Sequence, residues 1–336
     1  MPRHFKNLNI LFVLLMLFHS RGFSQPPDGV SDSTAHAKYS AQIHQINPGL
    51  SFVYEKPGAF DHFKRFPGDI SRYFQITFRK KNLIKIGAMA SITALLVAVD
   101  QPILDETKRF GRRIGLNGNR RMKTAFEIGG WPMEVPHDTD TWLYFIGDGW
   151  VQTGITAAFL GYGLMAKSNR ALTTSSQLAE GLLTTAFAVQ LLKHITGRES
   201  PHVATADAGK WRLFPNQIEY HKRVPNYDAF PSGHLAVAMM TVTVISGNYP
   251  ENKLVRPIGY SLMTILAFQM VNNGVHWVSD YPLALSMGYT FAKIALERGG
   301  TSPKNAHAGR ATNSPQTSVL PYVTGDGLGV RFSLAF

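Results

Sequence analysis

Long apolar segments separated by short polar turns dominate the chain after residue 80. The first of them, residues 83–99, is interrupted only by Lys85. Segments of this length and hydrophobicity predict helices that are either buried or membrane-spanning. No stretch before the C-terminal tail alternates apolar and polar residues with the period of a β-strand. The pattern therefore predicts an all-α domain over residues 83–297, built as a bundle of about six core helices. The other helical segments are residues 142–166, 178–195, 233–246, 258–271 and 279–297.

The C-terminal tail has a different pattern. Residues 298–318 are rich in Gly, Ser, Thr, Asn and Pro and predict a linker. Residues 319–336 hold two short apolar segments around an Asp-Gly turn, which predicts a β-hairpin. A short strand is also predicted over residues 50–54. We expect the hairpin to pair with that strand, because a single hairpin cannot close a barrel.

The N-terminal residues carry a targeting pattern. A basic start precedes a short apolar run over residues 8–18, and the small residues Gly22 and Ser24 follow it. This arrangement predicts that residues 1–24 are a secretory signal peptide, cleaved before Gln25. An uncleaved anchor is the alternative, although the run is short for a membrane span.

Residues 25–82 connect this signal to the helical domain. They begin as a polar leader and continue, from about residue 60, as an irregular mixture of aromatic and basic residues. Such a mixture is typical of an amphipathic segment at a membrane surface. The alternative is a helix that packs its aromatic side chains on the main bundle.

Composition restricts the class of partner. The 336-residue chain carries a formal net charge of +12, which favours an anionic partner. The charge is spread along the chain and no nucleic-acid-binding module is recognisable, so no nucleic-acid partner is expected. The absence of cysteine excludes disulfides and thiolate metal sites. Residues 137–140 include metal-ligand residue types, but we interpret them as a turn and a helix cap.

Residues 231–234, with the sequence Pro-Ser-Gly-His, precede an apolar run and predict the start of a helix. Ser232 is a suitable N-cap, so the amides of Gly233 and His234 face outward at the positive end of that helix. Such an end binds anions, and phosphate is the commonest of them. We expect His234, in the same turn, to reach an oxygen of the bound anion.

Two further segments carry residues suited to phosphate chemistry. His276 lies four residues before Asp280, whose carboxylate would accept the proton of one imidazole nitrogen. The other nitrogen is then free to act as a nucleophile or a base. Lys193 follows an apolar helix and is expected to direct its ammonium group to the same place. Each residue alone would more often be structural, but three such segments in one helical chain favour a phosphate site.

The three segments resemble the signature of the type-2 phosphatidic acid phosphatase superfamily, which includes the bacterial class A acid phosphatases and the vanadium haloperoxidases. Its pattern is K-x6-R-P, then PSGH, then S-R-x5-H-x3-D. Here these motifs correspond to residues 193–201, 231–234 and 269–280. The resemblance covers the helical core, about residues 85–297.

The resemblance implies a phosphomonoesterase that uses no metal and no cofactor. His276 would attack phosphorus and form a phosphohistidine, while Asp280 would orient its imidazole. His234 would protonate the leaving alkoxide and later activate water. The residues implied to hold the phosphate oxygens are Lys193, Ser232 and Gly233.

Two arginines of the pattern are missing from this chain. Ser200 replaces the first, and Gln269-Met270 replaces the Ser-Arg pair of the third motif. Neither serine nor methionine substitutes for a bidentate guanidinium. Arg198, two residues before Ser200, is the favoured replacement as a phosphate ligand. Further candidates in the loop before residue 231 are Arg212 and Lys222.

Two functions of different class follow from these residues. The favoured one is a metal-independent phosphatase of the cell envelope that hydrolyses a phosphorylated lipid or another phosphate monoester. The alternative is a catalytically impaired envelope protein that keeps the fold and binds an anionic headgroup. Retention of both histidines and of Asp280 favours the enzyme. Haloperoxidase chemistry is least favoured, because vanadate needs the same missing cations.

The signal peptide predicts export, and we expect a membrane-associated protein with its site on the periplasmic face. A soluble periplasmic protein is the alternative. The basic segment over residues 108–123 is typical of a cytoplasmic loop. Three spans before Lys193 would, however, place the first motif in the cytoplasm. We therefore expect that one early segment does not span, or that the bundle is only peripherally attached.

Overall fold

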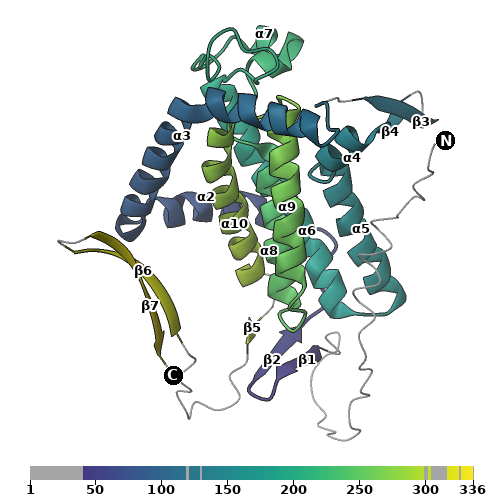
Figure 1. Ribbon diagram of the computed structural model, residues 1–336. Helices are drawn as coiled ribbons and strands as arrows, with labels where there is room; N and C mark the ends of the chain where they lie inside the picture. Colours follow the sequence, from purple (N-terminus) through teal and green to yellow (C-terminus); the bar gives the residue numbers. More distant parts are fainter. Residues whose placement is uncertain are drawn as a thin grey trace, which may run out of the picture. The chain divides into compact units, whose positions relative to one another are not determined.

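The computed structural model describes residues 41–118, 121–128, 131–298, 302–303, 316–324 and 327–335 (Figure 1). The predicted signal peptide, residues 1–24, lies outside the described residues. The same holds for the first part of the predicted leader and for most of the predicted linker.

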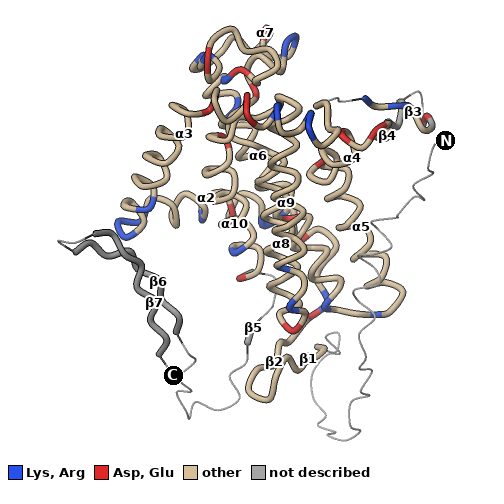
Figure 2. Tube along the Cα trace, in the orientation of Figure 1, with Lys and Arg blue, Asp and Glu red and all other residues tan. Residues whose placement is uncertain are grey.

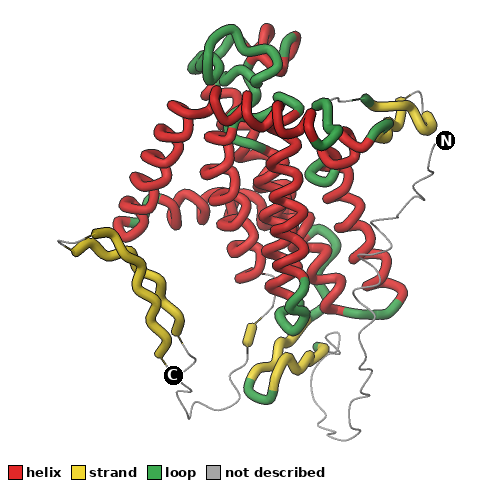
Figure 3. Tube along the Cα trace, in the orientation of Figure 1, coloured by secondary structure: helices red, strands yellow, loops and turns green. Residues whose placement is uncertain are grey.

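Helices make up most of the described chain, as Figure 3 shows. The prediction of an all-α fold is confirmed. Loops are short except between α6 and α8, where residues 197–232 hold only one short helix and one 3-10 turn. The helices are α2 (Asp61–Thr77), α3 (Lys80–Arg113), α4 (Thr139–Phe145), α5 (Gly149–Met165), α6 (Asn169–Thr196), α7 (Gln217–Lys222), α8 (Gly233–Asn248), α9 (Val255–Asn272) and α10 (Tyr281–Arg298), with 3-10 turns η1 (Val224–Asn226) and η2 (Val278–Asp280).

Helix α8 lies at the centre of the core and packs against α6, α9 and α10 (Figure 1). Its buried side chains include Leu235 and Met240. The approach of α10 is close, because a Cβ atom on Gly288 would lie 2.0 Å from the carbonyl oxygen of Ala236. Only glycine fits there, so this contact packs the middle of α10 closely against the first turns of α8.

The strands form three small sheets. β2 (Leu50–Tyr54) pairs with β1 (Gln42–Asn47) and with β5 (Ser302–Pro303). The predicted C-terminal hairpin is present as β6 (Gln316–Thr324) and β7 (Gly327–Ala335), which pair with each other. A further hairpin is formed by β3 (Met122–Ile128) and β4 (Trp131–Pro136). It contradicts the expectation that no stretch before the C-terminal tail alternates with the period of a strand.

The expected pairing of the C-terminal hairpin with residues 50–54 is wrong. Both edges of β2 are occupied, one by β1 and the other by β5. Because β1 ends three residues before β2 begins, the turn between them closes at a low entropic cost. A distant hairpin cannot compete with that local partner.

Helix α2 covers part of the bundle. The ring of Phe66 lies 5.3 Å from that of Phe187 on α6, and Tyr73 stacks on Phe291 of α10 at 4.5 Å. These contacts agree with a helix that packs aromatic side chains on the bundle. Another part of its surface stays open, since Phe63 is 57% exposed.

Helix α3 extends the predicted apolar segment to 34 residues. Its stretch between Lys85 and Asp100 carries no charge, and Figure 2 shows Lys and Arg gathered toward its two ends. Large apolar side chains of this stretch face outward, with Ile92 50% and Leu95 71% exposed. Among the described residues, α3 is the one helix whose length and composition suit a membrane span.

Helix caps explain several boundaries. The side chains of Asp138 and Asp148 accept hydrogen bonds from the first amides of α4 and α5. Residues 137–140 thus form a turn and a cap, as predicted. At the other end of α6, Gly197 adopts a left-handed φ of 52° and ends the helix.

Candidate active site

The fold brings the second and third motif segments into direct contact. The amide of Ser232 donates to the carbonyl oxygen of Asp280 at 3.1 Å, which joins the start of α8 to η2. The rings of His234 and His276 then face each other edge to face, with their centroids 6.0 Å apart. His234 also lies against Tyr144 of α4, at 4.8 Å between centroids.

His276 and Asp280 form a buried pair. Nδ1 of His276 lies 2.7 Å from the carbonyl oxygen of Ala229 and 3.3 Å from Oδ2 of Asp280. Both partners accept hydrogen bonds, so Nδ1 is the protonated nitrogen of the neutral ring. The lone pair is then on Nε2. Asp280 Oδ2 also accepts from the amide of Trp277 at 2.8 Å, which fixes the carboxylate in its turn.

The start of α8 is capped as predicted. Oγ of Ser232 accepts from the amide of Leu235 at 3.5 Å. The same hydroxyl lies 3.8 Å from Sδ of Met270, which is fully buried. At the position of the motif's arginine, an uncharged thioether therefore packs on the helix start.

Lys193 lies in the last turn of α6 and is largely buried. Its Nζ is 3.5 Å from Oδ2 of Asp228, which belongs to the loop before α8. The side chain of Asp228 is 28% exposed, so this ion pair is at the boundary with solvent. Lys193 thus has a carboxylate partner that any bound phosphate must displace or share.

Arg198 lies behind the histidine–aspartate pair and is completely buried. Its Nη1 donates to Oδ1 of Asp280 at 2.5 Å and to Oγ of Ser279 at 2.6 Å. Its Nη2 donates to Oδ2 of Asp100 at 2.7 Å and to the carbonyl oxygen of Ala208 at 2.8 Å. The guanidinium that we expected on the phosphate is therefore bonded to two carboxylates on the far side of Asp280.

The other residues considered in the sequence analysis also have partners in the fold. Ser200 is buried, and its amide donates to the carbonyl oxygen of Pro225. Gln269 donates to Oδ1 of Asn273 at 2.5 Å. Lys222 pairs with Glu219 on the surface of α7.

Glu199 organises the loop that carries Arg198. Burial alone would raise its pKa, but hydrogen bonds from the amides of Thr205 and Lys210, and from the side chains of Arg212 and Thr205, outweigh burial and lower the pKa to about 2. The contact with Arg212 is 2.6 Å from Nη2 to Oε1. Arg212, the second candidate for the missing cation, is thus bound to this carboxylate.

Asp100, Ser279 and Glu199 were not singled out in the sequence. Asp100 did carry a signal, because an acidic residue in an apolar helix is costly to bury without a partner. Its partners lie 98 and 179 residues away, and no local pattern identifies them.

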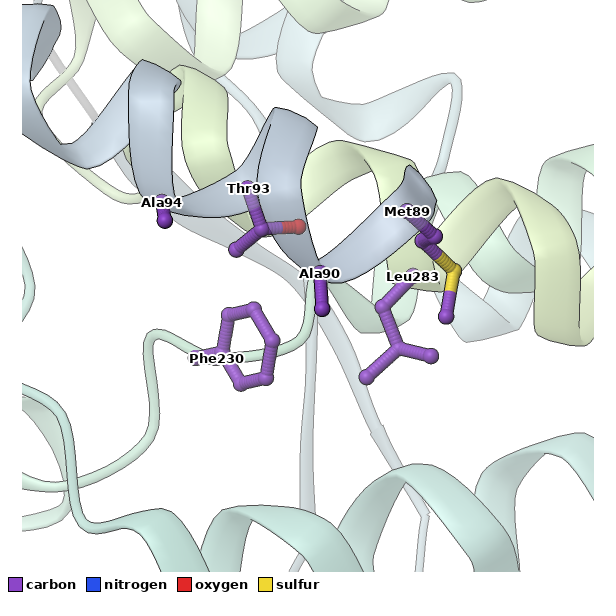
Figure 4. Close-up of a pocket in the computed structure, with 6 residues that line it drawn as sticks. All are labelled: Met89, Ala90, Thr93, Ala94, Phe230 and Leu283. Atoms are coloured by element: carbon purple, nitrogen blue, oxygen red, sulfur yellow. The ribbon is translucent and has the colours of Figure 1, made fainter. Parts of the chain in front are cut away.

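An apolar cavity of about 290 Å³ lies beside the site, at the residue that precedes Pro231. Figure 4 shows Phe230 and Leu283 facing one side of α3. Its six lining residues include one hydroxyl, that of Thr93. The lining residues are Met89, Ala90, Thr93, Ala94, Phe230 and Leu283.

All three motif segments fall within residues 175–301, which match the model of the PAP2 superfamily. This match agrees with the resemblance that the motifs predicted for the helical core. A solved structure is also similar to it, the crystal structure of the first transmembrane PAP2 type phosphatidylglycerolphosphate phosphatase from Bacillus subtilis. That chain is 15% identical, with a TM-score of 0.35, over 70% of this chain and 94% of its own length. No curated protein matches the chain.

Proposed function

We propose that the protein is a metal-independent phosphatase that hydrolyses a phosphate monoester through a phosphohistidine on His276. The observation that carries this proposal is the state of the His276 ring. Two acceptors hold its Nδ1, which leaves Nε2 with the lone pair and places His234 at 6.0 Å between ring centroids. A nucleophile oriented by a third group is the general arrangement of covalent catalysis.

In this mechanism Nε2 of His276 attacks phosphorus, and the bond from phosphorus to the leaving oxygen breaks. His234 gives its proton to that oxygen. Neutral His234 then removes a proton from a water molecule, which attacks phosphorus and breaks the phosphorus–nitrogen bond. Inorganic phosphate leaves, and both histidines return to their starting states.

The negative charge of the phosphoryl group is stabilised by two features. The amides of Gly233 and His234 belong to the positive end of α8, capped by Ser232. Lys193 supplies an ammonium group if it exchanges Asp228 for the phosphate. Loss of one stabilising donor commonly reduces kcat by about 10²- to 10³-fold. We therefore expect slow turnover relative to a site that keeps both motif arginines.

The substrate class we propose is a phosphorylated lipid. Three observations support it: the apolar cavity beside Phe230, the exposed apolar side chains of α3, and the position of that cavity next to residues 231–234. A phosphate at the start of α8 would leave an acyl chain free to lie along α3. We propose that α3 is inserted in the membrane of the cell envelope and that the site faces the periplasm, as the predicted signal peptide suggests.

One observation favours a second function. Met270 places a thioether on the phosphate side, and both Lys193 and Arg198 have carboxylate partners. The alternative function is therefore binding of an anionic headgroup without turnover.

The test uses the full-length protein purified in detergent, with phosphatidic acid and p-nitrophenyl phosphate as substrates. We expect phosphate release that His276→Ala abolishes and that His221→Ala leaves unchanged. His221 is the matched control because it is exposed on α7 and, among the described residues, its hydrogen bond is to the carbonyl oxygen of Gln217 in its own helix. Its ring also lies 5.6 Å from that of His194. Equal rates for the wild type and His276→Ala would exclude the phosphohistidine mechanism. Binding of anionic vesicles without turnover would then identify the headgroup-binding function.

A further inference from the structure

Asp100 is the buried carboxylate of α3, and it lies outside the segment that matches the superfamily. Its Oδ1 accepts from the amide of Ser279 at 3.1 Å. Its Oδ2 accepts from Nη2 of Arg198 at 2.7 Å and from the hydroxyl of Ser279. Every oxygen of this carboxylate is thus committed to the loop and turn that surround Asp280.

A continuous path leads from Asp100 to the nucleophile. Arg198 uses one amino group for Asp100 and the other for Oδ1 of Asp280, at 2.5 Å. The remaining oxygen of Asp280, Oδ2, faces Nδ1 of His276. The position of the Asp280 carboxylate therefore depends on a guanidinium that Asp100 holds.

Charge explains why a second carboxylate is needed. Arg198 alone beside Asp280 would neutralise it and weaken its hold on His276. With Asp100 present, two carboxylates and one guanidinium leave one negative charge behind the imidazole. The ring becomes positive when Nε2 bonds to phosphorus while Nδ1 keeps its proton. A buried negative charge stabilises that state more strongly than it would in water.

We propose that Asp100 is a positioning residue for the His276–Asp280 pair, acting through Arg198 and Ser279. It couples α3, the candidate membrane span, to the nucleophile. This inference rests on the proposed function for its kinetic consequence, but the position of the imidazole proton tests it independently.

The kinetic test compares Asp100→Asn with Asp105→Asn. Asp105 lies on the same helix, is exposed, and hydrogen-bonds within the described part of the chain to Gln101 of that helix. We expect Asp100→Asn to lower kcat by about 10- to 100-fold with little change in KM, by analogy with the loss of an outer partner of a metal-bound histidine. Asp105→Asn should leave both constants unchanged.

A double-mutant cycle separates positioning from general loss of structure. If Asp100 acts through Asp280, Asp100→Asn should cost less than about 2-fold in an Asp280→Asn background. An undiminished, additive loss would overturn the proposal. Should Asp100→Asn fail to fold, Ser279→Ala removes the hydroxyl that bridges Asp100 and Arg198, and the same non-additivity with Asp280→Asn is expected.

The second readout needs no turnover. In ¹⁵N-histidine-labelled protein, the Nδ1 proton of His276 should give a downfield imidazole resonance, assigned by its loss in His276→Ala. We expect Asp100→Asn to shift or abolish this resonance and Asp105→Asn to preserve it. An unchanged resonance in folded Asp100→Asn would overturn the inference even if the protein is an active phosphatase. Conversely, equal rates in the wild type and His276→Ala refute the proposed function and leave this measurement valid.

Discussion

The two sides of His276 differ in the charge that they carry. Behind the ring, Asp280, Arg198 and Asp100 form a fully buried network with short ion pairs. On the side of His234, the start of α8 meets the uncharged sulfur of Met270. His276, the proposed nucleophile, thus has several charged groups behind it, whereas anion binding in the proposed site would depend on backbone amides and Lys193.

For the proposed reaction, this difference predicts which part of catalysis is weakest. A buried ion-pair network is weak ground for inferring stability, because desolvation offsets much of its Coulombic gain. Its orientation toward one imidazole nitrogen favours a role in placing the nucleophile. In the proposed mechanism, we therefore expect the phosphoryl oxygens to be stabilised less well than His276 is oriented.

The largest expected effect comes from the buried side. Asp280→Asn keeps the volume but replaces an acceptor of the His276 proton with an amide. We expect kcat to fall by on the order of 10³- to 10⁴-fold, as it does for the aspartate–histidine pair of serine proteases. The measurement is phosphate release by folded protein, with Asp207→Asn in the loop before α8 as the control. A fall in kcat of less than 10-fold would contradict a role of the buried network in orienting His276.

The next largest effect is a gain in activity from a substitution on the His234 side of His276. Met270→Arg restores a guanidinium beside Ser232, and we expect kcat/KM to rise by about 10²-fold, the value of one stabilising donor. Met270→Leu, which conserves the volume without the charge, should leave the rate unchanged.

Thermal unfolding must accompany this experiment, since Met270 is fully buried and a larger, charged side chain is costly there. Folded Met270→Arg protein that gains no activity would show that charge is not what the anion-binding side lacks. The missing positive charge beside Ser232 would then not explain slow turnover.

The sequence predicted the helical core and both histidines because local patterns encode them. Apolar segments reveal helices, and Ser232 and Gly233 identify a helix start without reference to the rest of the chain. His276 and Asp280 are four residues apart, so their contact is also local.

The sequence did not predict the position of the Arg198 side chain, which depends on contacts between residues far apart in the chain. Arg198 was expected on the phosphate because it lies beside Ser200 in the first motif. In the fold, Gly197 ends α6 and the backbone of Arg198 then pairs with Trp211 and Asp228. The guanidinium points to Asp100, whose separation of 98 residues no pattern reveals. The β1–β2 pairing, by contrast, is local, yet it was missed because the polar residues of β1 give no strand signal.

A smaller effect is expected from the ion pair of Lys193. Asp228→Asn removes the carboxylate that lies 3.5 Å from its Nζ and so frees the ammonium group for phosphate. Partly exposed pairs contribute about 0–1 kcal/mol, so we expect inorganic phosphate to inhibit at up to about 5-fold lower concentration. Asp105→Asn is the control. Weaker inhibition by phosphate in Asp228→Asn would show that Asp228 orients Lys193 instead of competing with the anion.

The last effect concerns stability rather than turnover and arises at Glu199, which holds the loop behind the site. Its folded pKa of about 2 lies below the ordinary value of 4.5, so the folded state binds the carboxylate form preferentially. The stability it contributes is therefore complete above about pH 4.5 and is lost as pH falls toward 2. We expect the unfolding temperature of the wild type to fall through this window.

Glu199→Gln should remove that part of the acid dependence, because the amide does not titrate and cannot replace the ion pair with Arg212. Glu219→Gln is the control, since Glu219 is exposed on α7 and pairs only with Lys222 among the described ion pairs. If the unfolding temperatures of the wild type and Glu199→Gln differed by the same amount at pH 5 and at pH 2, the proposed link between the pKa of Glu199 and stability would be contradicted. If the Nδ1 proton resonance of His276 disappears over the same pH range in which stability falls, the loop of Arg198 and His276 unfold as one cooperative unit. The carboxylates that are distant in the sequence then stabilise the buried side of His276 together.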